Sequence, residues 1–212
     1  GCEMVFAVDI GNTNIVISCF SGNDISFVER ISTRSDMTSL EYAITFKNIL
    51  EFYNIDKADV DGAIISSVVP TVTSVIQDAV KRTMGVDALV VGPGLKTGIN
   101  ILIDNPAQLG SDLVVGAVAG IAEYSLPLVL IDMGTATTVS VIDENRNYIG
   151  GMILPGVNIS LNALATKTSQ LPKVGFDRPK KIIGSNTVDC MKSGILYGSA
   201  SALDGIVDRI EE

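Results

Sequence analysis

The sequence contains no histidine, and this absence excludes several common kinds of active site. Without histidine there can be no Ser-His-Asp triad, no Cys-His nucleophile pair and no histidine-ligated zinc. Any acid–base chemistry therefore has to come from Asp, Glu, Lys, Tyr or Cys side chains.

Cysteine is scarce as well: only Cys2, Cys19 and Cys190 are present, and they are far apart in the sequence. Their odd number and their spacing match neither a metal site nor a disulfide framework. We expect free thiols in a reducing compartment. Because no signal peptide is recognisable either, the sequence favours a cytoplasmic protein.

Basic residues are outnumbered, with 15 Lys and Arg against 24 Asp and Glu, which gives a net charge of −9. Binding to a phosphate backbone needs a basic surface, so we expect no nucleic-acid partner. No apolar run approaches the ~18 residues needed to span a bilayer, so we expect no membrane partner. Hydrophobic residues, in contrast, are abundant. They make up 47% of the 212 residues, which is enough for one large or two small hydrophobic cores.

The first half of the chain follows the order βββ-α-β-α-β, judged from the periodicity of its apolar residues. Thr38 or Ser39 is the expected N-cap of the first helix, and Pro70 and Gly85 mark the ends of the second. These elements are expected at residues 4–8, 15–20, 25–33, 38–55, 62–69, 70–85 and 87–92.

A segment rich in Gly, Pro and Asn follows at residues 93–112 and indicates a long ordered loop. Loops of this length in compact domains are more often functional than not. Residues 113–124 then predict a mostly buried helix, with Asp112 near its first turn.

The pattern of the N-terminus then returns 123 positions later. Asp9 and Gly11 of "VDIGNTN" correspond to Asp132 and Gly134 of "IDMGTAT", each between two apolar runs. A third strand at 148–156 and helices at 158–168 and 186–210 follow the second copy. This internal repeat predicts an α/β fold of two duplicated domains, residues 1–110 and 111–212.

The second copy ends earlier in the pattern than the first. The first copy continues from its long helix with a strand, a helix and a strand, whereas the sequence stops at Glu212, within or just after a helix. We expect that the C-terminal part of the second domain is missing. A shorter second domain is the alternative.

Each Asp-Gly turn follows a buried strand, where a carboxylate costs free energy unless it is paired or binds a cation. One such turn could be an ordinary hairpin aspartate. Two copies in the same register favour a second interpretation, in which both loops grip a polyphosphate across a cleft with main-chain N–H groups. Asp9 and Asp132 would then hold a hard cation such as magnesium or potassium. Neither loop is a P-loop, because GxxxxGK[ST] does not occur.

The whole set of motifs resembles a known family. Duplicated βββαβαβ units with such turns look like the superfamily of acetate and sugar kinases, Hsp70 and actin. More closely, "DIGNTNIV", "PGLKTGI", "DNPAQLGSD", "DMGTATTVSVI", "GGMILPG", "TSQLP" and "NTVDCMKSGILYG" resemble the type III pantothenate kinases. The seven motifs occur in the right order over nearly the whole chain. The resemblance implies actin-like (ribonuclease H-like) domains around a central cleft.

The resemblance also implies an activity: ATP-dependent phosphorylation of the primary hydroxyl of pantothenate to 4'-phosphopantothenate, the first step of coenzyme A biosynthesis. Magnesium and a monovalent cation, potassium or ammonium, are the implied cofactors. Asp132 matches the ligand of the monovalent cation, and Asp9 is a possible magnesium ligand through water. The matching ATP and phosphate contacts are Asp9, Ile10, Gly11, Asn12, Thr13, Asn14, Ile15, Val16 and Thr135.

The family further implies a homodimer with the pantothenate site at the subunit interface. Asp112 matches the general base. The matching substrate contacts are Ile103, Gly110, Ser111, Asp112, Leu113 and Thr187.

Asp112 also has a bottom-up argument, because it lies in a Gly-rich loop that enters a helix, where main-chain amides favour negative charge. Phosphoryl transfer depends mainly on positioning and charge neutralisation, so one aspartate that orients a hydroxyl suffices. The alternative is that Asp112 only caps the helix.

Two positions depart from the family pattern. Leu113 stands where the family usually has Arg after the base aspartate, and Ile103 stands where it usually has Tyr. Leucine cannot replace the bidentate contacts of arginine. The alternatives that stay open are a kinase for another small alcohol, or a nucleotide-binding, non-catalytic homologue of the kind described as a transcription accessory factor.

Overall fold

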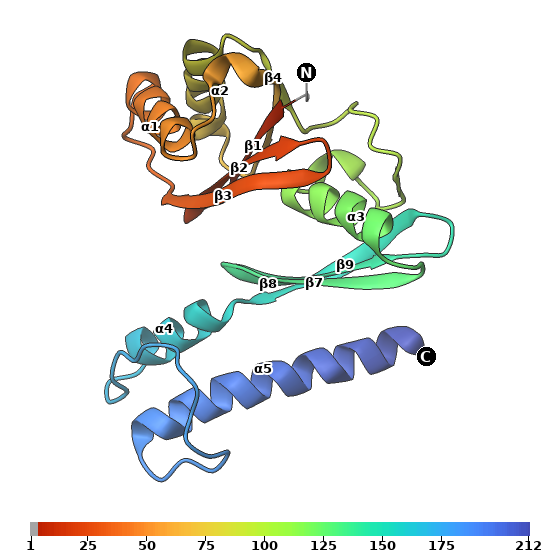
Figure 1. Ribbon diagram of the computed structural model, residues 1–212. Helices are drawn as coiled ribbons and strands as arrows, with labels where there is room; N and C mark the ends of the chain where they lie inside the picture. Colours follow the sequence, from red (N-terminus) through yellow and green to blue (C-terminus); the bar gives the residue numbers. More distant parts are fainter. Residues whose placement is uncertain (1–3) are drawn as a thin grey trace. The chain divides into compact units, whose positions relative to one another are not determined.

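Figure 1 shows the computed structural model, which describes residues 4–212. Contacts divide the chain into two compact units. Unit 1 contains the residues up to Ile99 and Asp104–Ala119, and unit 2 contains Asn100–Ile103 and Gly120–Glu212. The chain therefore divides inside a helix, whereas the sequence suggested a division at residue 110, and the assignment of whole domains stays a prediction.

Unit 1 is built on a five-stranded mixed sheet in the order β3-β2-β1-β4-β5. The first three strands form an antiparallel meander, and β4 and β5 continue the sheet parallel to β1. The strands are β1 (Met4–Ile10), β2 (Asn14–Ser21), β3 (Asp24–Ser32), β4 (Val60–Ser67) and β5 (Ala88–Val90).

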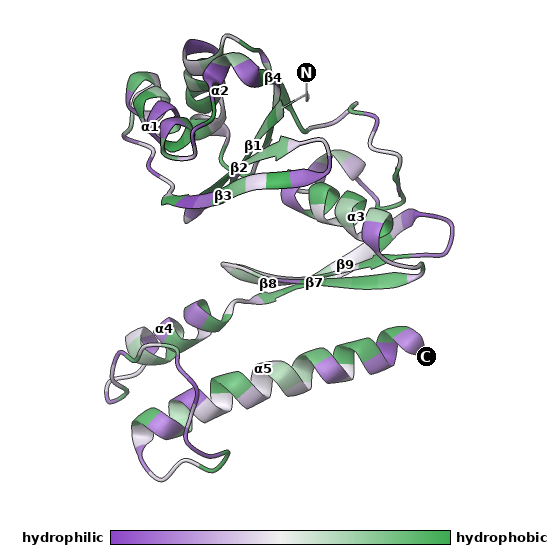
Figure 2. Cartoon of the chain, in the orientation of Figure 1, coloured by the Kyte–Doolittle hydropathy of each residue, from purple (hydrophilic) through white to green (hydrophobic). Residues whose placement is uncertain are grey.

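Two helices, α1 (Ser39–Phe52) and α2 (Pro70–Met84), pack with this sheet in one hydrophobic core. Alternate side chains of β1 are buried, as the two-residue period of a strand requires. Phe6 of β1 meets Phe46 of α1 edge to face, with ring centroids 5.3 Å apart. Figure 2 shows that hydrophobic and hydrophilic residues are mixed along β3 and both helices.

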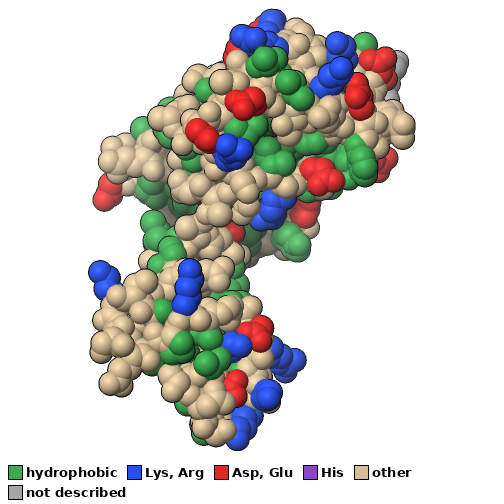
Figure 3. Space-filling view, turned by 90° about the vertical axis from the view of Figure 1, so that its left-hand side faces the viewer, with side chains coloured by type: hydrophobic (Ala, Val, Ile, Leu, Met, Phe, Trp, Pro, Cys, Tyr) green, Lys and Arg blue, Asp and Glu red, His purple; other side chains and the backbone are tan. Residues whose placement is uncertain are grey.

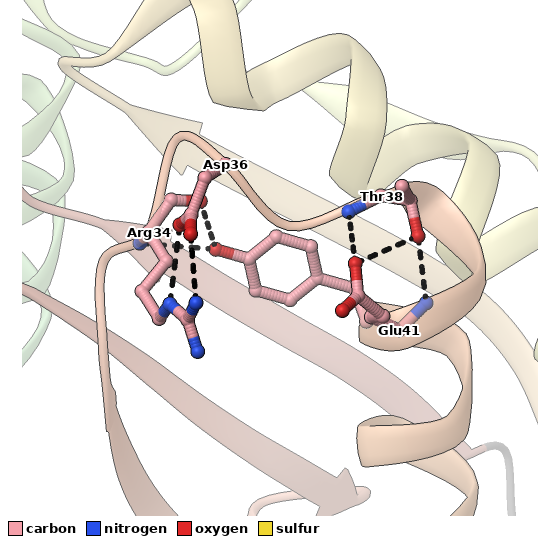
Figure 4. A network of polar contacts seen from close by, with 5 residues as sticks. Arg34, Asp36, Thr38 and Glu41 are labelled. Carbon is pink, nitrogen blue, oxygen red and sulfur yellow. Dashed lines mark hydrogen bonds and ion pairs between the residues drawn. The ribbon is translucent and has the colours of Figure 1, made fainter.

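The ends of these helices are where the sequence placed them. Thr38 is the N-cap of α1, and its hydroxyl accepts a hydrogen bond of 3.3 Å from the Glu41 amide. In return, the Thr38 amide donates to the Glu41 carboxylate at 2.7 Å, which completes a capping box (Figure 4). This bond lowers the pKa of Glu41. Pro70 begins α2, and Gly85 ends it with a left-handed φ of 77°.

A second polar contact in the same region fixes the segment between β3 and α1. The Tyr42 hydroxyl donates to the main-chain carbonyl of Arg34 at 2.8 Å, and the Arg34 guanidinium binds Asp36 through two hydrogen bonds of 2.7 and 3.1 Å (Figure 4). The chain that leaves the first meander is thereby tied to the first turns of α1.

Unit 2 contains a four-stranded sheet in the order β6-β9-β8-β7. Its strands are β6 (Asn100–Ile101), β7 (Leu128–Met133), β8 (Ala136–Ile142) and β9 (Asn147–Pro155). The helices α4 (Val157–Lys167) and α5 (Thr187–Glu211) follow, and α3 (Ser111–Glu123) contributes residues to both units. Two short 3₁₀ helices complete the described chain, η1 (Lys57–Asp59) and η2 (Pro106–Gln108).

The meander β7-β8-β9 repeats the antiparallel pairing of β1-β2-β3, each followed by a helix. The predicted α/β fold with a duplicated unit is confirmed. One detail was missed: residues 93–112, expected as a loop, contain β6, which pairs in parallel with β9. Among the described residues, β7 has no parallel neighbour of the kind that β4 provides to β1.

The predictions made from composition concerned the cysteines, membrane spans and the surface charge. Cys19 is a buried free thiol and Cys190 an exposed one, while Cys2 lies outside the described residues. No helix in residues 4–212 combines the length and the apolar character that a membrane span requires. On the face shown in Figure 3, acidic and basic side chains are interspersed.

Candidate functional site: the two Asp-Gly turns and the start of α3

The first Asp-Gly turn joins β1 to β2 and is closed by main-chain hydrogen bonds. The Gly11 amide donates to the Asn14 carbonyl at 2.9 Å, and a Cβ at position 11 would lie only 3.0 Å from that oxygen. Thr33, just after β3, holds the turn from one side. Its amide donates to the Thr13 carbonyl at 2.9 Å, and its hydroxyl to the Gly11 carbonyl at 2.7 Å. The turn is therefore tight and held in place.

Burial separates the predicted phosphate contacts into three groups. Ile10 and Ile15 are completely buried, so a ligand could meet them only through their main chain. Asp9, Asn12 and Thr13 are exposed at the turn. Asn14 and Val16 are half-buried.

The second turn joins β7 to β8 and is one residue shorter between the bonded groups than the first. The Gly134 amide donates to the Ala136 carbonyl at 3.0 Å, and Asp132 and Thr135 are exposed. Gly156, just after β9, lies against this turn. A Cβ there would overlap the Thr135 carbonyl oxygen and lie 2.8 Å from that of Gly134. A side chain at position 156 would therefore displace the turn.

Asp112 lies in the first turn of α3, and its carboxylate accepts a hydrogen bond of 2.9 Å from the Leu113 amide. The same amide also donates to the Gly110 carbonyl at 3.1 Å, so the carboxylate is a second acceptor for an N–H group that is already paired. The side chain is nevertheless exposed, as a base that meets a substrate has to be.

The start of α3 is fastened to the end of β4 within unit 1. The Ser111 hydroxyl donates to the Ser67 carbonyl at 2.7 Å and accepts from the Ser67 amide at 3.0 Å. Ser67 is the register partner of Ile10 at the end of β1. Unit 1 thus joins the strand that carries Asp9 and the helix that carries Asp112 through one residue of β4.

The remaining predicted substrate contacts are divided between the units. Gly110 and Leu113 belong to unit 1, whereas Ile103 and Thr187 belong to unit 2. Ile103 and Leu113 are half-buried, and Thr187 is exposed as the first residue of α5. Their meeting around one substrate stays a prediction.

At the two turns, Asp9 and Asp132 could each offer a hard cation a single carboxylate. Among the described residues, no three His, Cys, Asp or Glu side chains gather as a metal-binding group. Magnesium at a nucleotide site commonly uses one or two carboxylates together with phosphate oxygens and water. The exposed carboxylates of Asp9 and Asp132, each beside a turn that could meet a phosphate, suit that mode.

Sequence reasoning missed three residues that shape these sites: Thr33, Gly156 and Ser67. Thr33 and Gly156 are 123 positions apart, the same spacing as Asp9 and Asp132. The repeat therefore carried a signal for both. Nothing in the local pattern indicated the bond between Ser67 and Ser111.

Comparison with known proteins agrees with these features. Residues 5–209 match the family of type III pantothenate kinases. The chain belongs to this family. A type III pantothenate kinase of Geobacillus sp. (strain WCH70) is 43% identical over 98% of this chain and 81% of its own length. One of Exiguobacterium sp. (strain ATCC BAA-1283 / AT1b) is 43% identical over 98% of this chain and 82% of its own.

Structural comparison supports the fold alone. A solved structure from Campylobacter jejuni, assigned to the Baf family of transcriptional activators, superposes with a TM-score of 0.51 at 16% identity. The superposition covers 94% of this chain and 78% of that one. That protein shares the architecture of this chain. At 16% identity the likeness concerns the fold and not the chemistry.

Proposed function

We propose that the chain is an ATP-dependent kinase that transfers the γ-phosphoryl group to the primary hydroxyl of pantothenate, the first step of coenzyme A biosynthesis. The observation that carries the proposal is the family match over residues 5–209, which includes both Asp-Gly turns and Asp112. The tight, glycine-containing turns are suited to approach phosphate oxygens closely.

The proposed reaction is a direct displacement at the γ-phosphorus. The substrate hydroxyl oxygen forms the new P–O bond while the bond between the γ-phosphorus and the β,γ-bridging oxygen breaks, which releases ADP. Asp112 orients the hydroxyl and accepts its proton. The amides of Gly11 and Gly134 close the two turns, so other main-chain amides of these turns hold the phosphates, and Thr135 contributes to the same contact.

The proposed cofactors are magnesium, held through water by Asp9, and potassium or ammonium, held by Asp132. When bound, these cations neutralise the charge that phosphoryl transfer concentrates on the phosphate oxygens. We further propose a cytoplasmic homodimer whose substrate pocket includes Ile103, Gly110, Ser111, Leu113 and Thr187.

A second candidate is a kinase for another small alcohol, or a homologue that binds nucleotide without transferring phosphate. Leu113 and Ile103 favour it, because two aliphatic side chains stand where the family usually presents Arg and Tyr. A pocket built to pair a carboxylate with arginine loses that pairing when the arginine becomes leucine.

One experiment separates these candidates. The natural gene product that carries this sequence is incubated with ATP, magnesium and potassium, together with pantothenate or a panel of other small alcohols, and products are identified by mass spectrometry. We expect phosphopantothenate as the main product. Phosphorylation of a different alcohol in preference to pantothenate would assign another substrate, and ATP binding without any phosphorylated product would assign the non-catalytic role.

A further inference from the structure

The Ser111 hydroxyl makes an unusual pair of contacts for a residue at the start of a helix. It uses both its donor and its acceptor capacity on the main chain of Ser67, 44 positions away, at 2.7 and 3.0 Å. The Ser66 hydroxyl lies 3.4 Å from the same oxygen. Neither bond involves an N–H group of α3, so the hydroxyl does not cap the helix and instead ties it to β4.

The other end of this contact is part of the first Asp-Gly site. In the parallel pairing of β1 and β4, Asp9 is the register partner of Ser66, and Ile10 is that of Ser67. The amide that follows Ser67 donates to the Ile10 carbonyl at 3.0 Å. Ser111 therefore attaches α3 to the sheet at the residue beside the first turn.

Asp112 is constrained from two further sides. Its carboxylate accepts the Leu113 amide at 2.9 Å, and a Cβ at position 110 would lie 2.5 Å from one of its oxygens. A side chain at position 110 would therefore force this carboxylate to shift. Since residue 111 is anchored, the backbone on both sides of Asp112 has little freedom to carry that carboxylate elsewhere.

We infer that Ser111 is a positioning residue: its bonds to the Ser67 main chain set the orientation of the Asp112 carboxylate relative to the first Asp-Gly turn. This inference rests on the proposed function, in which Asp112 accepts the proton of the substrate hydroxyl. Small displacements of a catalytic group are costly, because a shift of about 1 Å can reduce a rate by about a hundredfold.

The test is the Ser111→Ala variant, measured by steady-state kinetics and by amide hydrogen exchange in NMR. We expect kcat to fall at least about tenfold while the KM for ATP stays within about twofold, because orientation of the base changes and nucleotide binding does not. We also expect exchange at the Ser67 amide to accelerate about tenfold, since it loses its hydrogen bond to the Ser111 hydroxyl.

Two matched variants separate positioning from general damage. Thr73→Val removes a hydroxyl that bonds to the Ser67 side chain at 2.8 Å and leaves the Ser111 contacts in place, so kcat should be unchanged. Ser111→Thr keeps the hydroxyl and should keep most of kcat. An unaltered kcat in Ser111→Ala, or an equal loss in Thr73→Val, would overturn the inference.

The exchange measurement needs no substrate and therefore distinguishes two failures. If the wild type phosphorylates no alcohol, the proposed function fails whatever the exchange rates are. If exchange at the Ser67 amide is the same in wild type and Ser111→Ala, the hydroxyl does not hold this segment, and the positioning role fails whether or not the protein is a kinase.

Discussion

At the residue scale, the two Asp-Gly turns share two features, although the closing bond spans three positions in the first and two in the second. In each, a glycine amide closes the turn onto a main-chain carbonyl, at 2.9 Å in the first turn and 3.0 Å in the second. In each, the residue after the third strand of the meander packs on the turn: Thr33 by hydrogen bonds and Gly156 by close approach of its backbone. Each turn is thus held by its own hydrogen bond and by a neighbouring residue, which would reduce the ordering cost of binding a ligand.

Gly156 provides the prediction at this scale. Gly156→Ala should weaken ATP binding by about tenfold, because the added methyl displaces the Gly134 and Thr135 carbonyls and with them the neighbouring amides. Isothermal titration with ATP and magnesium measures the change. Gly175→Ala is the control, because a Cβ there meets nothing within 4 Å. Equal affinities in the two variants would show that the second turn takes no part in nucleotide binding.

Residue-level prediction from the sequence succeeded where a residue's role is local or repeated. Asp9 and Asp132 could be paired because the repeat places them 123 positions apart. The bond between Ser111 and Ser67 could not be foreseen, because it joins segments 44 positions apart and depends on how α3 leaves the loop before it. The burial of Ile10 and Ile15, which restricts them to main-chain contacts, follows from alternation along the strand and was open to prediction.

At the element scale, helix ends were predictable because capping chemistry is local. Thr38, Pro70 and Gly85 all take the predicted roles. The strand β6 was missed because its two residues carry no periodicity of their own, and its pairing with β9 comes from the tertiary fold. Short strands of this kind are specified by their neighbours more than by their own sequence.

The capping box of α1 leads to a prediction about pH. The pKa of Glu41 is lowered by the bond from the Thr38 amide, so its charged form favours the folded state. This stabilisation is complete above the unfolded pKa of about 4.3 and disappears as the pH falls through the lower folded pKa. Glu41→Gln should therefore lower the urea midpoint at pH 7, and the difference from wild type should shrink toward zero in acid.

The matched control lies at the opposite end of the same helix. Glu51 is in the last turn of α1, where the helix dipole disfavours negative charge, and its exposed pair with Lys47 at 3.6 Å contributes little. Glu51→Gln should leave the midpoint unchanged or raise it slightly. If both variants lost the same stability with the same pH dependence, the capping box would not be the cause.

At the scale of the whole molecule, the chain carries the same supersecondary unit twice, and each copy offers one Asp-Gly turn. The duplication was evident from the sequence, because the two copies share their order of strands and their polar turns. How far the second copy extends was harder to judge. The chain spans 81% and 82% of the length of the two relatives described above.

The whole-molecule proposal assigns different tasks to the two copies. The first contributes a phosphate turn together with the base, because Asp9 and Asp112 both belong to unit 1. The second contributes the other turn and the cation ligand Asp132. Loss of the base should therefore stop transfer without preventing nucleotide binding, which is a sharper expectation than loss of activity alone.

The most direct measurement of this account is phosphopantothenate formation by the wild type and Asp112→Asn, with ATP affinity determined on the same samples. We predict product in the wild type, a decrease in kcat of at least about a hundredfold in the variant, and ATP affinities within about twofold of each other. Turnover that is equal in both proteins would contradict the assignment of Asp112 as the base, and a folded wild type that binds ATP but forms no phosphopantothenate would contradict the proposed function.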